Sequence, residues 1–431
     1  GPGPANSEHF SAESHRTFRQ RARIRGALSA CVLAALAASP PSTLARPYAG
    51  FSGLAAAADS ALTAGTNPAG ITRFEKPAYQ LEALAFLSES TWEGEVGDSG
   101  LTTRSSESGE TYVPSGYLIK PINDDFSFGF TVLGMGFSDD LGDWAGKYFI
   151  TSYESINVSA FPSIAYRIND KLSVAASLSL SYAMFNQEKA IANLFDPGYE
   201  DGLAKVETDG VDTGFSVSML YEITPNTRWG LVYMSEVDPE MDGKVKYEGL
   251  GPNTRAVLEE AGVVGAKVEV SSRTPQSLLA GVYHEFNNRH AVTVDLAWSD
   301  FSRFKLSEFY FDGETLAENE ANYQDIYALS VGYSWPVTPR WMLGVAGIYV
   351  DDMIEDDERT MTLRLDSIWS LALAAEWQWK EGRKLQLGLS YMDLGDAPVT
   401  TPDIPGIGAV AGKFSNREAI LLRVGLAFGS L

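Results

Sequence analysis

Residues Leu172 to Tyr182 read LSVAASLSLSY, so apolar or aromatic side chains alternate with Ser and Ala. Successive side chains of an extended chain point to opposite faces, which gives this segment one apolar face and one small, polar face. The same two-residue period recurs at 292–298, 384–391 and 422–428. A strand that separates lipid from a lumen has this pattern.

The strands of a soluble β-sandwich also alternate between apolar and polar residues. The lengths of the connections between strands distinguish a membrane barrel from such a sandwich. We predict about fourteen strands, an even number as is usual for these barrels. They lie near 79–91, 111–121, 126–140, 152–168, 171–188, 209–224, 227–238, 268–287, 290–302, 323–336, 339–351, 365–380, 383–395 and 417–430.

The predicted links alternate in length. Short ones with turn residues fall at 123–125, 169–170, 225–226, 287–288, 336–339 and 381–382, and long ones at 91–111, 140–152, 188–209, 238–268, 302–323, 351–365 and 395–417. Short turns on one rim and long loops on the other are typical of an outer-membrane barrel. The sequence therefore predicts an all-β fold, a transmembrane antiparallel β-barrel over 77–431, with both termini at the short-turn rim.

Aromatic residues gather beside the predicted short turns: Phe126, Tyr166, Trp229, Phe286, Trp335, Trp341, Trp377 and Trp379. Amphipathic rings favour the boundary between hydrocarbon and headgroups, so we predict one aromatic girdle at this rim.

Composition agrees with an exported membrane barrel. The net charge of −23 argues against a nucleic-acid partner. After the N-terminal region no stretch of 18 apolar residues predicts a membrane helix, and a barrel strand would not produce one. The one Cys, Cys31, lies in a segment that we expect to be removed, so no disulfide framework is expected.

The N-terminal 45 residues are predicted to be a leader. Five Arg between 16 and 25 precede the apolar run 27–38 and the small-residue site Thr43-Leu44-Ala45. This is the order of a secretory signal, and we place cleavage after Ala45. A lipoprotein site at Cys31 is disfavoured, because only a few apolar residues precede it. Residues 1–15 fit either a long natural leader or a cloning remnant.

Residues 46–76 have no strand period and end in Thr66-Asn67-Pro68-Ala69-Gly70. Such a segment can hang free or fold inside the lumen. With Asn67, Pro68 and Ala69, and with Ala57 to Ala61 before them, the chain resembles the FadL family of outer-membrane transporters of hydrophobic compounds. The likeness continues at 120–126, 166–173, 221–228, 274–277 and 295–304, and it covers 46–431.

The resemblance implies a fourteen-stranded barrel with a lumenal hatch over 46–76 that includes Asn67, Pro68 and Ala69. It also implies passive uptake of hydrophobic molecules by capture between outer loops, entry into a lumenal pocket, and lateral release at a kink in the third strand. The hatch looks shorter than the family archetype. The chain also ends three residues after Phe428 rather than on an aromatic residue.

Candidates for these steps can be named. Gly129, Gly134 and Gly136 in the third strand would permit a kink, or would only relieve crowding. A landing surface is predicted from Leu194 and Phe195 in one long loop and Val257 and Leu258 in a helix-like stretch at 254–264, with packing within the loops as the alternative. Arg423 faces the predicted lumen, where it would contact ligand or pair with Asp295 or Glu376.

The sequence also bears on three other functions. An enzyme is disfavoured, because residues after the leader include only His284 and His290 and no nucleophile elbow, zinc-ligand spacing or P-loop. The acidic residues at 351–358 suggest a solvated loop more than a calcium site. A general aqueous porin stays an alternative, and it would have no Asn-Pro-Ala hatch. A structural or adhesive barrel would show no ligand uptake.

We therefore expect a non-enzymatic outer-membrane importer without cofactor or metal. Its expected partners are a hydrophobic small molecule, outer-membrane lipid and lipopolysaccharide, and the protein is expected to act as a monomer. Long-chain fatty acids are the first expected substrate, and aliphatic or aromatic hydrocarbons are the alternative.

Overall fold

A computed structural model describes residues 52–97, 101–238, 240–271, 273–303, 308–311, 314–317, 322–359, 366–403 and 406–429. The predicted leader, 1–45, lies outside the described residues, as does the start of the predicted hatch.

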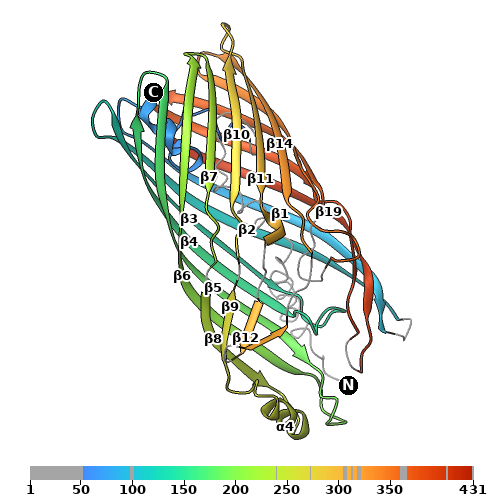
Figure 1. Cartoon of the computed structure of the whole chain (residues 1–431). Coiled ribbons are helices and arrows are strands. Elements are labelled where there is room, and N and C mark those ends of the chain that lie inside the picture. The colour runs from blue at the N-terminus through green and yellow to red at the C-terminus, as the bar shows by residue number, and fades with distance from the viewer. Residues whose placement is uncertain are drawn as a thin grey trace, which may run out of the picture.

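Fourteen strands among the described residues close into one antiparallel ring (Figure 1). They are β1 (Ala78–Val96), β2 (Leu101–Pro121), β3 (Phe126–Asp140), β4 (Ser152–Arg167), β5 (Leu172–Ile191), β6 (Gly202–Thr224), β7 (Thr227–Met234), β10 (Ser277–Glu285), β11 (Ala291–Ser299), β14 (Ile326–Thr338), β15 (Trp341–Val350), β16 (Ile368–Lys380), β17 (Arg383–Asp393) and β19 (Val410–Phe428). The first and last strands pair along their length, from Tyr79 opposite Phe428 to Val96 opposite Val410. The predicted barrel is confirmed.

The two rims differ as predicted. The short turns and the C-terminus lie at one end of the barrel, and α4 (Pro252–Glu260) with the long loops lies at the other (Figure 1). None of the described helices is both long and apolar enough to span a membrane.

Several predicted long loops are wrong in part, because strands continue into them. β1 and β2 remain paired up to Val96 and Leu101, and β5 and β6 up to Ile191 and Gly202. Backbone pairing needs no apolar face, so these polar extensions showed no alternation in the sequence. Further short strands lie in the outer loops: β8 (Glu240–Glu248), β9 (Lys267–Ser271), β12 (Glu308–Phe311), β13 (Glu314–Ala317) and β18 (Ala397–Thr400).

The predicted strand 268–287 is also interrupted. It divides into β9 and β10, and between them Thr274 makes an isolated bridge with Val237. Pro275 explains part of this break, because it has no N–H to donate to a ladder.

Along 172–182 of β5, apolar side chains face outward and small or polar ones face the lumen, as the alternation predicted. On β5 the side chains of Leu178, Leu180 and Tyr182 point outward and are exposed, whereas Ser173 and Ser177 point inward and are buried. Outward Leu, Val and aromatic side chains recur on the other strands of the ring. The outer surface is thus apolar where lipid would contact it.

Aromatic rings at the short-turn rim contact one another across strands. Phe126 stacks on Tyr166 with centroids 4.8 Å apart, and Trp341 stacks on Trp377 at 5.8 Å. Phe428 lies against Tyr79 at 5.3 Å, so an aromatic ring covers the seam between the first and last strands.

A lysine at Leu296, an exposed outward position near the middle of β11, is expected to destabilise the barrel by about 2–4 kcal/mol, because its charge would lie near the bilayer midplane. The matched change Val337→Lys, beside the short-turn rim, should cost about 1 kcal/mol or less. Urea unfolding of both variants in lipid vesicles measures the difference. If the two variants lost the same free energy of unfolding, the assignment of the lipid-facing surface would be contradicted.

Candidate functional site

The N-terminal segment, defined here as residues 52–76, lies against the inner wall near the short-turn rim (Figure 1). It contains α3 (Thr63–Thr66) and the 3-10 helix η1 (Pro68–Arg73). Most of its side chains are buried, and its apolar ones pack with Tyr117, Ile119 and Leu220 of the wall.

The Asn-Pro-Ala motif shapes this segment. The Asn67 side chain accepts the backbone N–H of Ala69 at 3.2 Å and so caps η1, which Pro68 begins. Its Nδ2 donates to the carbonyl oxygens of Ala55 (2.6 Å) and Met219 (3.1 Å), the latter on β6. Asn67 therefore ties two parts of the segment to each other and to the wall.

Charged side chains hold the end of the segment to the short-turn rim. Arg73 forms an ion pair with Glu222 at 2.7 Å and donates to the carbonyl oxygen of Ala58 at 2.7 Å. Arg167 donates to the carbonyl oxygen of Thr72. These contacts join the segment to β4 and β6.

The inner wall carries a buried polar network on β1, β16, β17 and β19. Arg423 pairs with Glu82 at 3.0 Å and donates to Gln386 at 2.8 Å. Gln386 donates in turn to Glu376 at 3.0 Å, and Lys384 pairs with Glu376 at 3.2 Å. The network therefore contains two cations and two carboxylates and is close to neutral.

The structure thus brings Glu376 and Arg423 together through Gln386. Asp295, the other partner suggested for Arg423, lies on β11 and accepts hydrogen bonds from the N-terminal segment instead. Sequence reasoning missed Glu82. Its position in the alternation of β1, between outward Leu81 and Ala83, could have placed it inward.

Beyond this network the lumen becomes apolar. One cluster combines inward wall residues, including Leu84, Phe86 and Leu421, with Met353 and Ile354 from an outer loop that folds inward. All five are 9% exposed or less. Sequence reasoning missed this cluster, because inward positions were expected to be small or polar.

The outer loops present exposed apolar side chains. Leu194 and Phe195 are exposed in the β5–β6 loop, and Val257 is exposed on α4, whereas Leu258 is half-buried. The predicted helix 254–264 is wrong at both ends, since α4 spans Pro252–Glu260 and the chain turns at Gly262 with φ 75°.

Asp196 joins these two loops. Its carboxylate accepts the backbone N–H groups of Asn253 (3.1 Å) and Thr254 (2.7 Å) at the start of α4. This is a helix cap supplied by a residue distant in sequence. It fixes α4 beside Leu194 and Phe195.

Gly134 and Gly136 lie on the outward face of β3, whereas Gly129 faces inward beside Ile71 of the N-terminal segment. β3 pairs with β4 over its whole length. Its ladder with β2 is interrupted opposite Gly134, where Pro114 has no N–H to donate. The predicted kink remains a prediction.

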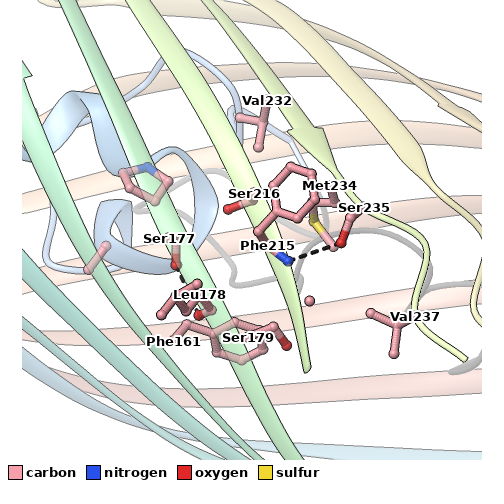
Figure 2. A pocket seen from close by; sticks show the side chains of 14 residues that line it. Phe161, Ser177, Leu178, Ser179, Phe215, Ser216, Val232, Met234, Ser235 and Val237 are labelled. Atoms are coloured by element: carbon pink, nitrogen blue, oxygen red, sulfur yellow. Dashed lines mark hydrogen bonds between the residues drawn. The ribbon is translucent and has the colours of Figure 1, made fainter. Parts of the chain in front are cut away.

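A cavity lies where β5, β6 and β7 meet the N-terminal segment (Figure 2). Its lining includes Gly65 and Pro68 of the segment, and also Leu178 and Phe215, whose side chains point outward. The β6–β7 ladder ends at this level, and Phe215 instead exchanges hydrogen bonds with Ser235 at 3.0 and 2.9 Å. The cavity therefore lies at a break in the wall.

Comparison with known proteins identifies the family. The family model described as outer membrane protein transport protein (OMPP1/FadL/TodX) matches residues 29–425. The chain belongs to the OMPP1/FadL/TodX family. The resemblance found in the sequence is confirmed, and the protein is an outer-membrane transport protein rather than an enzyme.

Relatives in this family match most of the chain. The chain is 26% identical over 401 residues to a long-chain fatty acid transport protein of Escherichia coli O6:H1, covering 85% of this chain and 87% of that one. It is 24% identical over 412 residues to outer membrane protein P1 of Haemophilus influenzae, covering 83% and 85%.

Solved structures of the family have the same fold. A Pseudomonas aeruginosa FadL homologue gives a TM-score of 0.75 at 16% identity, covering 89% of this chain and 98% of that one. The Pseudomonas putida toluene transporter TodX gives 0.59 at 16%, covering 85% and 93%. Among the described residues of this family member, no group of His, Cys, Asp and Glu is placed to hold a metal ion.

The change Asp196→Ala is expected to loosen α4, because two backbone N–H groups lose their acceptor. Amide exchange at 252–260 should become about five-fold faster, as expected for loss of a helix cap. Glu200→Ala, an exposed carboxylate in the same loop, should have no effect. Unchanged exchange in Asp196→Ala would contradict the cap.

The same contact should depend on pH. Burial acts to raise the pKa of Asp196, but the hydrogen bonds from Thr254 and Asn253 outweigh it and hold the pKa below its ordinary value. The stabilisation is then complete above the ordinary Asp pKa of about 3.9 and is lost as pH falls through the lower folded value. The protection factors at 252–260, which compare observed with intrinsic exchange at each pH, should therefore fall in acid in the native protein and fall no further in Asp196→Ala.

Proposed function

We propose that this protein takes up hydrophobic molecules passively across the outer membrane, with long-chain fatty acids as its first substrate. The observation that carries the proposal is the apolar cluster around Phe86 and Leu421 inside the lumen. A channel for water and small polar solutes gains nothing from such a surface, whereas an acyl chain is stabilised by it. The cluster therefore favours a hydrophobic solute over the general porin.

Capture would begin at the outer loops. Leu194, Phe195 and Val257 expose apolar surface, and Asp196 fixes their loops together. Exposed apolar patches on folded proteins commonly mark binding sites. This surface would collect molecules that have passed the polar lipopolysaccharide layer.

Entry into the lumen would bring the solute to the apolar cluster. Met353 and Ile354 are packed within it and are at most 1% exposed, so we expect the outer loop that carries them to move when a solute binds. A fatty acid could keep its carboxylate near the neighbouring polar network, where Arg423 and Lys384 are already paired with Glu82 and Glu376. A neutral hydrocarbon would need no such group.

Release would occur sideways, into the bilayer, with residues 46–76 acting as a hatch. The cavity between Gly65, Leu178 and Phe215 supports this step, because it adjoins both the N-terminal segment and the outward face of the wall. The glycines of β3 offer a second candidate exit opposite Pro114. Either route spares an apolar solute from crossing water.

The relatives support the substrate class. A relative named as a long-chain fatty acid transport protein matches most of the chain, and this favours fatty acids. The similar structure of a toluene transporter keeps aromatic hydrocarbons as the second candidate. The proposed partners are accordingly the hydrophobic solute, outer-membrane lipid and lipopolysaccharide, with a monomer as the transporting unit.

Labelled oleate uptake into cells that lack their own transporter tests the proposal. The protein should restore uptake, and Leu421→Gln, inside the apolar cluster, should lower it about ten-fold because an apolar contact is lost. Leu422→Gln is the matched control, since its side chain points to the outer face. Outer-membrane levels of each variant are measured alongside.

The outcomes separate the alternatives. Toluene uptake without oleate uptake would replace the fatty acid by an aromatic hydrocarbon. Uptake of neither, with a folded barrel present in the membrane, would contradict the proposed function.

A further inference from the structure

A row of small residues crosses the inner wall where the N-terminal segment begins. Gly230 of β7 lies opposite Gly281 of β10, which lies opposite Asp295 of β11, and Asp295 lies opposite Ser330 of β14. Gly332 of β14 is an inward neighbour of this row. Four adjacent strands thus contribute to one stretch of the inner wall.

The glycines are required by close approach of the segment. A Cβ atom at Gly230 would lie within 3.0 Å of the carbonyl group of Ala55. One at Gly281 would lie 2.0 Å from a carboxylate oxygen of Asp295 and 2.9 Å from the Ala55 side chain. One at Gly332 would come within 3.0 Å of Ser52. Such distances are not tolerated, so larger residues would lift residues 52–55 off the wall.

Asp295 binds the backbone that lies on this surface. Its carboxylate accepts three successive N–H groups, from Gly53 at 2.5 Å, Leu54 at 3.2 Å and Ala55 at 3.2 Å. Gly53 has φ 75°, a conformation that glycine adopts readily. Successive N–H groups that converge in this way form a concave anion-binding nest.

Arg228 binds the next two residues through their carbonyl oxygens, whereas Asp295 binds N–H groups. Its Nε donates to the carbonyl oxygen of Ala56 at 3.0 Å and its Nη2 to that of Ala57 at 2.6 Å. The guanidinium lies over the ring of Tyr283, 3.9 Å from the centroid, which fixes its plane. One anion and one cation on the wall therefore hold five consecutive residues by their main chain.

We propose that Gly230, Gly281, Gly332, Asp295 and Arg228 form a docking cradle for residues 52–57, and that Asp295 is the positioning residue that latches the N-terminal segment across the lumen. The cradle recognises backbone groups, and Asp295 is 3% exposed while the segment is docked. Undocking would exchange its three N–H donors for water, so the latch can open without breaking a ladder of the barrel. Release of the latch opens the lumen to small solutes.

Hydrogen exchange of the full-length protein in lipid nanodiscs tests the docking directly. The amides of 53–55 should exchange slowly in the native protein and at least about ten-fold faster in Asp295→Ala, which removes their acceptor. Gly281→Ala should have a similar effect, because its Cβ would displace both the Asp295 carboxylate and Ala55. Gly347→Ala is the matched control, because its new Cβ would meet only Leu371 at 4.0 Å on the outer face.

Ion conductance in planar bilayers tests the closure of the lumen. Asp295→Ala and Gly281→Ala should raise conductance above that of the native protein and Gly347→Ala. Native protection of 53–55 in Asp295→Ala, with an intact barrel, would overturn the latch, and faster exchange without added conductance would overturn its role in closing the lumen. The inference goes beyond uptake, since neither measurement involves a hydrophobic substrate, and failed oleate uptake would leave it standing.

Discussion

Pairing of β1 with β19 closes the ring, and both faces of the wall are determined by that closure. Hydrocarbon offers no water to unpaired backbone groups, so a sheet in a membrane must have no open edge. The ladder from Tyr79–Phe428 to Val96–Val410 removes that edge. Once the ring is closed, alternation commits one set of side chains to lipid and the other to the lumen.

The lumen is organised in levels along the barrel. Near the short-turn rim one side of the wall carries the polar network of Arg423, Glu82 and Glu376 joined through Gln386. At the same end the N-terminal segment packs on apolar wall residues such as Ile119 and Leu220. Farther out, the cluster around Phe86 and Leu421 is apolar, and loops with exposed Leu194 and Phe195 lie outside it. A hydrophobic solute would thus meet apolar surface at the mouth, in the interior and at the wall beside Phe215.

The sequence predicted the barrel well, because its evidence is local and repeated. Alternation, as in Leu178, Leu180 and Tyr182, predicts which face of a strand meets lipid. Turn residues at 123–125 and 225–226 predict which rim of the barrel carries the short turns. The polar strand extensions were missed, because hydrogen bonding between backbones leaves no trace in side-chain polarity. The end of α4 was misplaced, since the helix ends at Glu260 and the chain turns at Gly262, before the predicted end at 264.

The candidate site was predicted less completely. Asn67 and Asp295 were recognised from motif and alternation, but their partners, the backbone of Ala55 and Gly53, carry no side-chain signal at all. The apolar cluster required inward Leu84 and Leu421 to meet loop residues such as Met353. These residues are far apart in the sequence and meet only in the closed barrel. A single sequence therefore does not show that they are in contact.

A hydrophobic solute inside this lumen is tested by mass spectrometry of apolar molecules extracted from the protein, purified in detergent from outer membranes. A fatty acid or hydrocarbon should be retained by the native protein and by Leu422→Gln and be depleted in Leu421→Gln. Recovery of no apolar molecule beyond those of a detergent-only control would contradict a hydrophobic solute inside this lumen.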